Sequence, residues 1–549
     1  MNAPNDPTPT RDLVIVGAGL AGIYAMYRAK ELGLDVVGVE AGDSVGGTWY
    51  WNRYPGARCD VESVDYSYSF DRQLEKDWKW TERFATQPEI RSYLDHVADR
   101  YDLRRHFTFG RRVTAAHFDE QASTWTVTLD DGTRHRCRFL MMATGCLSAP
   151  NRPDLPGIDE YAGTQLFTAQ WPDEPVDLTG KRVGLIGTGS SGIQAAPLLA
   201  EQAQSLTVFQ RSANYTVPAR NRPLTEEEWE QVQATYPERR EASRYAPAGS
   251  LSTTHPQKAT EVDAAERERA FEARWQEGGV LFAKTFPDQS SDIVANDYAR
   301  EFAEAKIREI VKDPQVAEDL IPTDHPIGTK RIVTDTGYYE MYNRDNVELV
   351  NLRKHPIEQV TSWGIKTDDA SYELDVIVFA TGFDALTGAL TSIDLRGARG
   401  AVLADDWAHG PETYLGLGVA GFPNLITLNG PGSPSVLANM STHTEQQVDW
   451  GMELIEFCRA NGIDQAEPRK DAAEKWTEHL GEVAEGTLFT RAASWYMGAN
   501  IEGKTRTFMP YIGGFGNYRR LCDEARDNGF EGYVLTRVST GAESVEVGA

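Results

Sequence analysis

Positive charge is scarce in this chain. Its 549 residues include 55 Lys and Arg against 82 Asp and Glu, which gives a net charge of −27 at pH 7. Binding to nucleic acid requires a basic surface that neutralises phosphates, so this composition argues against a nucleic-acid partner. The excess of acidic residues favours solubility but does not indicate a particular fold or function.

Cysteine and long apolar stretches are scarce as well. No Cys-x-x-Cys pair is present among the five cysteines, Cys59, Cys137, Cys146, Cys458 and Cys522. This predicts a reducing cytoplasm, without a disulfide framework or a dithiol centre. No apolar stretch reaches the roughly 20 residues that span a bilayer, residues 1–11 lack the apolar core of a signal peptide, and no spaced set of metal ligands stands out. We therefore expect a cytoplasmic protein without a membrane anchor or a metal.

Two glycine-rich motifs, at residues 17–22 and 187–192, are the most informative features. Each follows a short apolar run, 13–16 and 183–186 respectively. In a strand–turn–helix unit such glycines permit a tight turn, let the backbone approach a pyrophosphate, and let the helix pack against the strand. The phosphates then lie at a helix N-terminus, where free N–H groups favour an anion. Two such units predict two bound dinucleotides, and so a flavin enzyme that takes hydride from a nicotinamide.

The end of the second strand in each unit distinguishes the two dinucleotides. Glu40 follows the apolar run 36–39, and a carboxylate there accepts a hydrogen bond from a ribose 2′-hydroxyl, as in FAD or NAD sites. Arg211 and Ser212 follow the run 206–210 in the second unit, where a cation pairs with a 2′-phosphate. The sequence therefore predicts FAD at the first motif and NADPH at the second.

The length of the chain requires more than one domain. We expect an α/β fold with two Rossmann-like dinucleotide-binding domains and a helical insertion, because the charged, helix-like region after residue 222 is too long for a loop. The predicted order is the first part of an FAD domain (1–150), the first part of an NADP domain (151–222), the helical insertion (223–330), the second part of the NADP domain (331–382) and the second part of the FAD domain (383–549).

Further motifs resemble one enzyme family. Residues 161–172, Tyr-Ala-Gly-Thr-Gln-Leu-Phe-Thr-Ala-Gln-Trp-Pro, lie between the two glycine motifs. They are similar to the fingerprint FxGxxxHxxxW(P/D) of type I Baeyer–Villiger monooxygenases, with Phe167 in place of the histidine. The resemblance runs from residue 12 to residue 537 and looks closest to the phenylacetone and steroid monooxygenase branch. Other matching stretches are 46–60, 328–331, 338–340, 343–346, 430–435 and 494–496.

The resemblance implies a reaction. These class B flavin monooxygenases use NADPH to reduce FAD, which adds O2 to form a C4a-peroxyflavin, and the peroxide attacks a ketone to give an ester or lactone. Such chemistry requires a fixed cation in a dry site, because the oxyanion of the adduct must be stabilised and the peroxide kept from water. We expect a bulky cyclic, steroid or aryl-substituted ketone as substrate and infer no obligate protein partner.

The resemblance also implies residue roles. It places Arg331 over the flavin as the cation, since a guanidinium stays charged at any working pH. Asp60 is expected to pair with Arg331 and hold it in position. Lys330 is expected to reach the 2′-phosphate together with Arg211 and Ser212.

The remaining cofactor contacts are likewise implied by the family. Those expected for FAD, besides Gly17, Gly19, Gly22 and Glu40, are Thr48, Trp49, Tyr50, Trp51, Asp60, Tyr66, Val113 and Met440. Those expected for NADP are Arg58, Cys59, Asp60, Thr188, Gly189, Ser190, Ser191, Gly192, Ile193, Gln194 and Trp495. The stretch 430–435 is expected to open a helix whose N-terminus is aimed at the isoalloxazine.

Four other functions compete with this one. A sister flavin monooxygenase would oxygenate nitrogen or sulfur, and a largely uncoupled enzyme would act as an NADPH oxidase. A disulfide reductase of the same architecture would need a second cysteine near Cys59. An NADPH-sensing protein would keep the glycines but would not need Asp60 and Arg331. The presence of Arg331 and of Trp171 with Pro172 favours the Baeyer–Villiger reaction.

Overall fold

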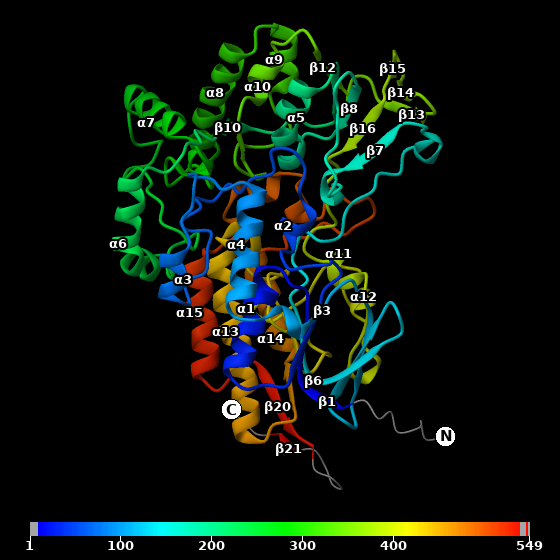
Figure 1. Cartoon of the computed structure of the whole chain (residues 1–549). Helices are drawn as coiled ribbons and strands as arrows, with labels where there is room; N and C mark the ends of the chain where they lie inside the picture. Colours follow the sequence, from blue (N-terminus) through cyan, green and yellow to red (C-terminus); the bar gives the residue numbers. More distant parts are fainter. Residues whose placement is uncertain (1–8, 539–544, 547–549) are drawn as a thin grey trace.

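Two sheets with parallel strands organise the chain. The computed structural model describes residues 9–538 and 545–546 (Figure 1). The prediction made for the N-terminal segment 1–11 falls largely on residues 1–8, which lie outside the described part. The first sheet has the order β17-β4-β5-β6-β1-β2-β3, and β18 also pairs with β6. Its strands are β1 (Thr10–Val16), β2 (Val36–Val39), β3 (Phe107–Thr108), β4 (Val113–Asp119), β5 (Thr124–Leu129), β6 (Arg134–Met142), β17 (Asp394–Arg396) and β18 (Leu425–Thr427).

The centre of the first sheet is parallel and fully buried. β1 lies between β2 and β6, with both neighbours parallel to it. Residues 13–16 and 139–142 are continuous apolar runs and are buried, as expected for parallel strands covered on both faces. β4, β5 and β6 are joined as an antiparallel meander. β17 and β18 come from the last third of the chain, so both ends of the sequence contribute to this sheet.

The second sheet is parallel throughout, in the order β12-β9-β8-β16-β7. Its strands are β7 (Thr164–Phe167), β8 (Arg182–Ile186), β9 (Ser205–Gln210), β12 (Val347–Asn351) and β16 (Val376–Phe379). Three smaller sheets join β10 (Thr216–Pro218) with β11 (Val333–Asp335), β13 (Ile357–Thr361) with β14 (Gly364–Thr367) and β15 (Ser371–Glu373), and β19 (Gln465–Pro468) with β20 (Tyr533–Arg537) and β21 (Val545–Glu546).

Helices cover both sheets. The α-helices are α1 (Leu20–Glu31), α2 (Thr48–Trp51), α3 (Arg72–Asp77), α4 (Gln87–Arg100), α5 (Ser190–Gln202), α6 (Glu226–Ser243), α7 (Ala264–Glu277), α8 (Ile293–Ile310), α9 (Pro314–Leu320), α10 (Tyr338–Met341), α11 (Gly388–Thr391), α12 (Leu403–Asp406), α13 (Met440–Asn461), α14 (Lys470–Glu485) and α15 (Phe515–Asp527). The 3-10 helices are η1 (Arg104–His106), η2 (Ile158–Glu160), η3 (Thr168–Gln170), η4 (Val280–Lys284), η5 (Ala398–Gly400), η6 (Ser435–Leu437), η7 (Leu488–Arg491) and η8 (Trp495–Met497). Among the described helices, none is long and apolar enough to cross a membrane.

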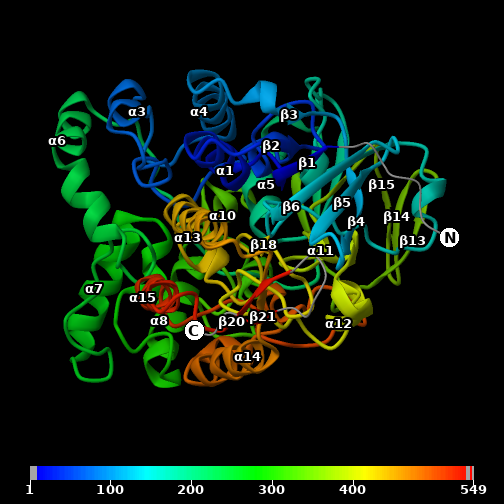
Figure 2. The same cartoon turned by 90° about the horizontal axis from the view of Figure 1, so that it is seen from below.

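The segment between β10 and β11 is helical and has its own core. Helices α7, η4 and α8 bury an aromatic cluster that includes Phe271, Trp275, Phe282, Phe286 and Phe302. Figures 1 and 2 show α6 and α7, in green, at one side of the molecule, with α6 beside α3. The α/β fold with two Rossmann-like units and a helical segment is thus confirmed, whereas the exact domain boundaries stay predictions.

The fingerprint stretch forms the edge of the second sheet. Phe167 ends β7 and lies opposite Phe379 on the parallel strand β16. Their rings stack with centroids 4.8 Å apart. The Tyr161 hydroxyl donates to the carbonyl of Leu374 at 2.9 Å. The phenylalanine that replaces the fingerprint histidine therefore makes an apolar cross-strand contact, which is typical of sheet packing.

The close approach of α1 to its preceding turn generates a prediction. A Cβ added to Gly22 would lie 1.8 Å from the carbonyl oxygen of Gly17, so Gly22→Ala must displace the first glycine loop. We expect a loss of about 1–3 kcal/mol in the free energy of unfolding and a lower flavin absorbance per protein. The matched control is Gly481→Ala, where a Cβ meets nothing within 4 Å on an exposed face of α14. It should be neutral or stabilising by up to about 1 kcal/mol; equal behaviour of the two variants would contradict the packing argument.

Candidate active site

The first glycine loop is fastened by Glu40. Its buried carboxylate accepts hydrogen bonds from the backbone N–H groups of Ala18 and Gly42, both at 2.7 Å. Burial raises the pKa of Glu40, and these N–H groups oppose the rise. Each carboxylate oxygen has more than one acceptor site, so a ribose hydroxyl can be bound as well. The arrangement fits the adenosine part of FAD, the group predicted here.

The second glycine loop leaves room for a ligand. A Cβ added to Gly189 would meet nothing within 4 Å, so the space over this loop is open, as the approach of a pyrophosphate requires. The Thr188 hydroxyl donates to the carbonyl of Ser212 at 2.8 Å, which joins the glycine loop to the end of β9. Ser190, Ser191, Gly192, Ile193 and Gln194 form the first turns of α5. Both glycine loops therefore fit the dinucleotides expected for them.

A loop of the first unit contacts α5 of the second. The Tyr54 hydroxyl donates to Gln194 Oε1 at 2.9 Å, and Gln194 Nε2 donates to the carbonyl of Arg58 at 3.2 Å. The structure thus brings together Arg58, Cys59, Asp60 and Gln194, all predicted to contact NADP. The guanidinium of Arg58 is itself paired with Glu82 at 2.6 Å, so only part of its charge is available to a ligand.

Arg331 and Asp60 form a bidentate ion pair. Nε and Nη2 of Arg331 donate to the two carboxylate oxygens of Asp60, each at 2.8 Å. Nη1 donates to the carbonyl of Val436 at 2.9 Å. Burial lowers the pKa of Arg331, but the charge of Asp60 and the hydrogen bonds to it raise the pKa by more, so the net pKa lies above that of a free guanidinium. The predicted pairing of these two residues is present in the structure.

Tyr496 lies beside Arg331 and was not singled out from the sequence. Burial raises the pKa of Tyr496 to about 12, and the charge of Arg331 opposes this rise. Trp495, the predicted NADP contact, packs against Tyr496 with ring centroids 4.2 Å apart. The apolar surroundings of Trp495 include Val436 and Met440. The motif Ser-Trp-Tyr was visible in the sequence, but only its tryptophan was assigned a role.

The helix expected to open at 430–435 begins later. Ser435–Leu437 is the short 3-10 helix η6, and the long helix α13 begins at Met440. The side chain of Asn439 caps α13 by accepting from the Ser441 backbone N–H at 3.2 Å. An Asn cap satisfies an N–H group of the first helical turn, which has no partner within the helix. The N-terminus of α13 is therefore set by Asn439, which corrects the sequence-based prediction.

The predicted FAD contacts lie at several places around the first unit. Thr48, Trp49, Tyr50 and Trp51 form the short helix α2, and Trp49 Nε1 donates to the Tyr66 hydroxyl at 3.1 Å. Val113 starts β4 and is buried, while Met440 starts α13. Nothing in the structure tests their contact with the flavin, so these assignments stay predictions.

The predicted phosphate-binding side chains gather at one edge of the second sheet. Ser212 accepts a hydrogen bond from Arg353 at 3.0 Å. Burial lowers the pKa of Lys330, Asp324 opposes this, and the nearby charges of Arg353 and Arg211 lower the pKa further. Arg353 was missed in the sequence because it follows a strand about 140 residues away from Ser212. The group fits an anion with the charge of a 2′-phosphate.

The cysteines do not form a redox pair. In the described part of the chain all five are free and buried. Burial, and then the neighbouring Asp60 carboxylate, raise the pKa of Cys59, which therefore stays a protonated thiol. A disulfide reductase needs a reactive pair of cysteines, so this geometry argues against that alternative.

Comparisons with known proteins identify several similar chains. Residues 14–271 match the family described as "Pyridine nucleotide-disulphide oxidoreductase". A solved steroid monooxygenase bound to NADP is 53% identical, with a TM-score of 0.92 over 96% of this chain and 99% of that one. A 2-oxo-Delta(3)-4,5,5-trimethylcyclopentenylacetyl-CoA monooxygenase of Pseudomonas putida is 42% identical over 96% of this chain and 99% of its own length. A Baeyer–Villiger monooxygenase of Pseudooceanicola batsensis is 41% identical over 96% of this chain and 97% of its own length.

The chain belongs to the Baeyer–Villiger monooxygenases. The family predicted from the sequence is thus confirmed, and with it a FAD-dependent enzyme that uses NADPH and oxidises ketones. The competing nitrogen- or sulfur-oxygenating and oxidase functions are not favoured by these relatives. The individual site residues stay predictions, supported by the contacts described above.

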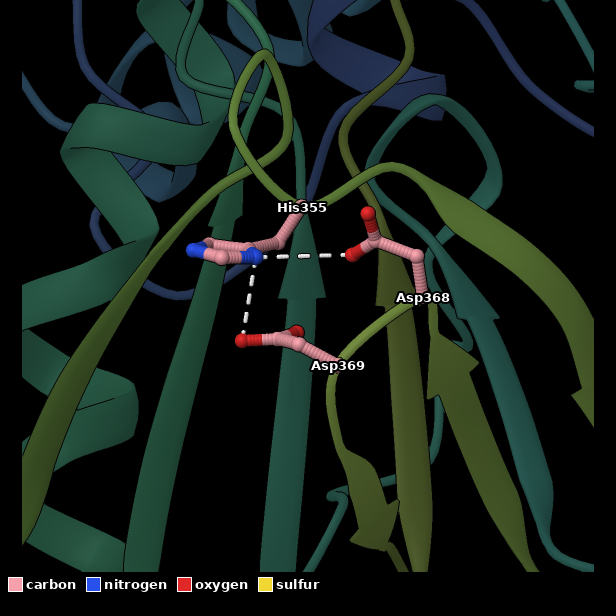
Figure 3. A group of neighbouring side chains, drawn as sticks. All are labelled: His355, Asp368 and Asp369. Atoms are coloured by element: carbon pink, nitrogen blue, oxygen red, sulfur yellow. Dashed lines mark ion pairs between the residues drawn. The ribbon is translucent and has the colours of Figure 1, made fainter.

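One group of possible metal ligands is present among the described residues of this Baeyer–Villiger monooxygenase. Nδ1 of His355, which lies between β12 and β13, is 3.0 Å from Asp369 and 3.4 Å from Asp368, the two residues that follow β14 (Figure 3). All three side chains are exposed by more than two fifths, at 42%, 45% and 46% for His355, Asp369 and Asp368. A surface histidine paired with two solvated carboxylates accounts for this geometry.

Helix α13 also carries a buried acid, Glu445. Its carboxylate accepts hydrogen bonds from the backbone N–H and the hydroxyl of Ser69, at 2.6 and 2.5 Å. Burial raises the pKa of Glu445 to about 7; the bonds from Ser69 and the charge of Arg240 oppose the rise, and Asp449 adds to it. Glu445 is thus more protonated in the folded protein than in the unfolded chain at intermediate pH.

This pKa shift predicts a pH dependence of stability. Between the ordinary pKa of 4.5 and about 7 the folded state binds more protons, so the free energy of unfolding falls as pH rises through this window. Glu445→Gln should match the wild type near pH 4 and be more stable at pH 8, by about 1–3 kcal/mol. Urea unfolding at both pH values measures this. The control Glu456→Gln changes an exposed position of the same helix and should leave the difference between the two pH values unaltered. A Glu445 variant that behaves like this control would overturn the argument.

Proposed function

We propose that this enzyme converts bulky cyclic, steroid or aryl-substituted ketones to esters or lactones, with NADPH and O2 as co-substrates and FAD as cofactor. The observation that carries the proposal is the Arg331–Asp60 pair, a fixed cation between the two glycine-loop units. The 53% identity to a steroid monooxygenase supports the substrate class. Bound FAD would supply the redox chemistry, accepting two electrons from NADPH and activating O2.

Arg331 is suited to stabilise an oxyanion. Its contacts with Asp60 and Val436 use three N–H donors, and a guanidinium has five. The two remaining donors can bind Tyr496 and a carbonyl oxygen that gains negative charge as the ketone is attacked. A donor already held in place stabilises developing charge without reorganising during the reaction. Asp60 provides that fixation, and 27% of the Arg331 side chain remains accessible to a ligand.

An apolar group beside Arg331 is our candidate for the ketone pocket. Val436, whose carbonyl binds Arg331, belongs to an apolar cluster at this point. Apolar linings with a few polar groups are typical of small-molecule sites, and this one suits a steroid or aryl ketone. The members of the cluster are Cys146, Leu147, Leu386, Val436, Met440, Trp495 and Met509.

We further propose that the enzyme works in the cytoplasm without an obligate protein partner. The five free, buried cysteines support a reducing compartment. The absence of a membrane-spanning helix from the described residues is compatible with this location.

The role of Arg331 can be tested by separating flavin reduction from oxygenation. Arg331→Ala should still consume NADPH, because the glycine loops are untouched, but ester formation should fall by about 100-fold or more, since the main oxyanion donor is gone. Gas chromatography of the ester and absorbance of NADPH give the two rates. Flavin content per protein shows whether the variant is loaded.

Arg331→Lys is the matched control for charge. It keeps the cation but loses the planar fork that binds both oxygens of Asp60, so we expect an intermediate rate of ester formation. If Arg331→Ala forms ester at the wild-type rate while holding FAD, the assigned role is wrong.

A further inference from the structure

Two neighbouring strands of the second sheet end side by side and bring polar side chains together. β9 and β12 are parallel, with Gln210 opposite Asn351 at their last residues. Ser212 and Arg353 each follow two residues later, so they emerge at the same carboxyl edge. Arg353 Nη2 donates to the Ser212 hydroxyl oxygen at 3.0 Å. In open parallel sheets this edge is where ligands bind.

Asp324 inserts a negative charge into this group of cations. Its Oδ2 atom lies 2.5 Å from Arg353 Nη2 and 3.5 Å from Lys330 Nζ. Its other oxygen, Oδ1, lies 2.6 Å from Nδ1 of His325. The hydrogen bond with His325, followed by the charge of Lys330, holds the pKa of Asp324 well below its usual range. One carboxylate oxygen is therefore shared by two cations.

The charges around Asp324 do not cancel. Burial lowers the pKa of His325 below its ordinary value, against the opposing effect of Asp324, and this favours the uncharged imidazole at neutral pH. Lys330 and Arg353 then share a single carboxylate, and Arg211 adds a further positive charge close to Lys330. An additional anion of high charge density would be bound favourably here, but it must share Lys330 and Arg353 with Asp324.

We propose that Asp324 is an internal counter-anion that competes with the 2′-phosphate of the coenzyme for Lys330 and Arg353, and thereby limits both the affinity for NADP(H) and the preference for NADPH over NADH. This inference rests on the proposed assignment of Arg211, Ser212 and Lys330 to the 2′-phosphate. It adds Arg353 as a fourth binding side chain and gives Asp324 an opposing role. In the free enzyme Asp324 keeps the two cations from repelling each other.

The turn that carries Arg353 is held independently of Asp324. Lys354 pairs with Asp319 at 2.6 Å, and His355 pairs with Asp369 and Asp368 (Figure 3). These contacts hold the two residues that follow Arg353 in place. Removing the charge of Asp324 should therefore free Arg353 for a ligand and leave its position unchanged.

Binding of 2′,5′-ADP and of AMP to the FAD-loaded enzyme isolates the contribution of the 2′-phosphate. In Asp324→Asn, calorimetry should show 2′,5′-ADP binding about tenfold more tightly than in the wild type, because a competing charge of the wrong sign is gone. The affinity for AMP, which lacks the 2′-phosphate, should stay the same. Unchanged or weaker binding of 2′,5′-ADP would overturn the proposal.

Two control variants distinguish the charge at Asp324 from the net charge of the protein. Asp324→Glu retains the carboxylate and should not tighten 2′,5′-ADP. Glu318→Gln removes a negative charge of α9 that is paired with Arg308 and should change the affinity by less than about twofold. Tightening in the Glu318 variant equal to that in Asp324→Asn would mean that the effect comes from net charge alone, and would overturn the specific role.

Arg353→Ala tests the other half of the proposal. It should weaken 2′,5′-ADP by about tenfold and leave AMP unaffected, whereas an unchanged affinity would remove Arg353 from the site and overturn the inference. A wild-type enzyme that binds 2′,5′-ADP no better than AMP gives a different failure. That result would refute the placement of the coenzyme phosphate at Arg211, Ser212 and Lys330, on which the inference depends.

Discussion

The bidentate pair between Asp60 and Arg331 is the constraint on which the arrangement of the site depends. A guanidinium packed among apolar side chains is tolerated only when a carboxylate compensates its charge. The two residues are separated by 271 positions in the chain, so their pairing fixes the loop after the first glycine unit against the loop that follows the helical segment. The cation is held in one orientation, since Nε and Nη2 bind the two oxygens of Asp60 and Nη1 binds the carbonyl of Val436. Loss of either residue would leave the other charge unpaired next to the proposed ketone pocket.

Asp65, in the same loop as Asp60, contacts both α13 and α6 of the helical segment. The carbonyl of Asp65 accepts hydrogen bonds from Asn439 and Ser441 at the start of α13, at 2.7 and 3.0 Å. Its carboxylate binds Arg239 of α6 in a bidentate pair with distances of 2.6 and 2.7 Å. One short loop therefore positions the partner of Arg331, the N-terminus of α13 and the attachment of α6. Such shared contacts make the effects of single substitutions in this loop non-additive.

The sequence was sufficient for features that local chain geometry determines. The glycine loops, Glu40 and Ser212 were all found because a βαβ unit fixes the spacing between its first turn and the end of its second strand. Arg353 and Asp324 escaped notice because their position depends on which distant strands are neighbours, and Gln210 opposite Asn351 is a register that no local pattern reveals. The resemblance to a known family supplied the pairing of Asp60 with Arg331, which spacing alone does not predict. The start of α13 was misplaced because the proline-rich stretch resembles a helix entry, whereas the Asn439 side chain caps the helix further on.

Strand register also determines the contacts of Phe167, the residue in place of the fingerprint histidine. Phe167 lies opposite Phe379, the last residue of β16, and the chain then turns at residues 380–382, where the carbonyl of Ala380 lies 2.5 Å from a Cβ added to Gly187. The stack of Phe167 on Phe379 thus holds the strand that packs against the second glycine loop. Directly after the fingerprint stretch, Asp173 pairs with Arg53 of the first unit. An aromatic pair of this kind contributes about 0.5–1.5 kcal/mol beyond its buried area, and it needs neither a proton nor a hydrogen-bond partner. A phenylalanine can therefore hold the edge strand in place at this position, although it cannot exchange a proton there as a histidine could.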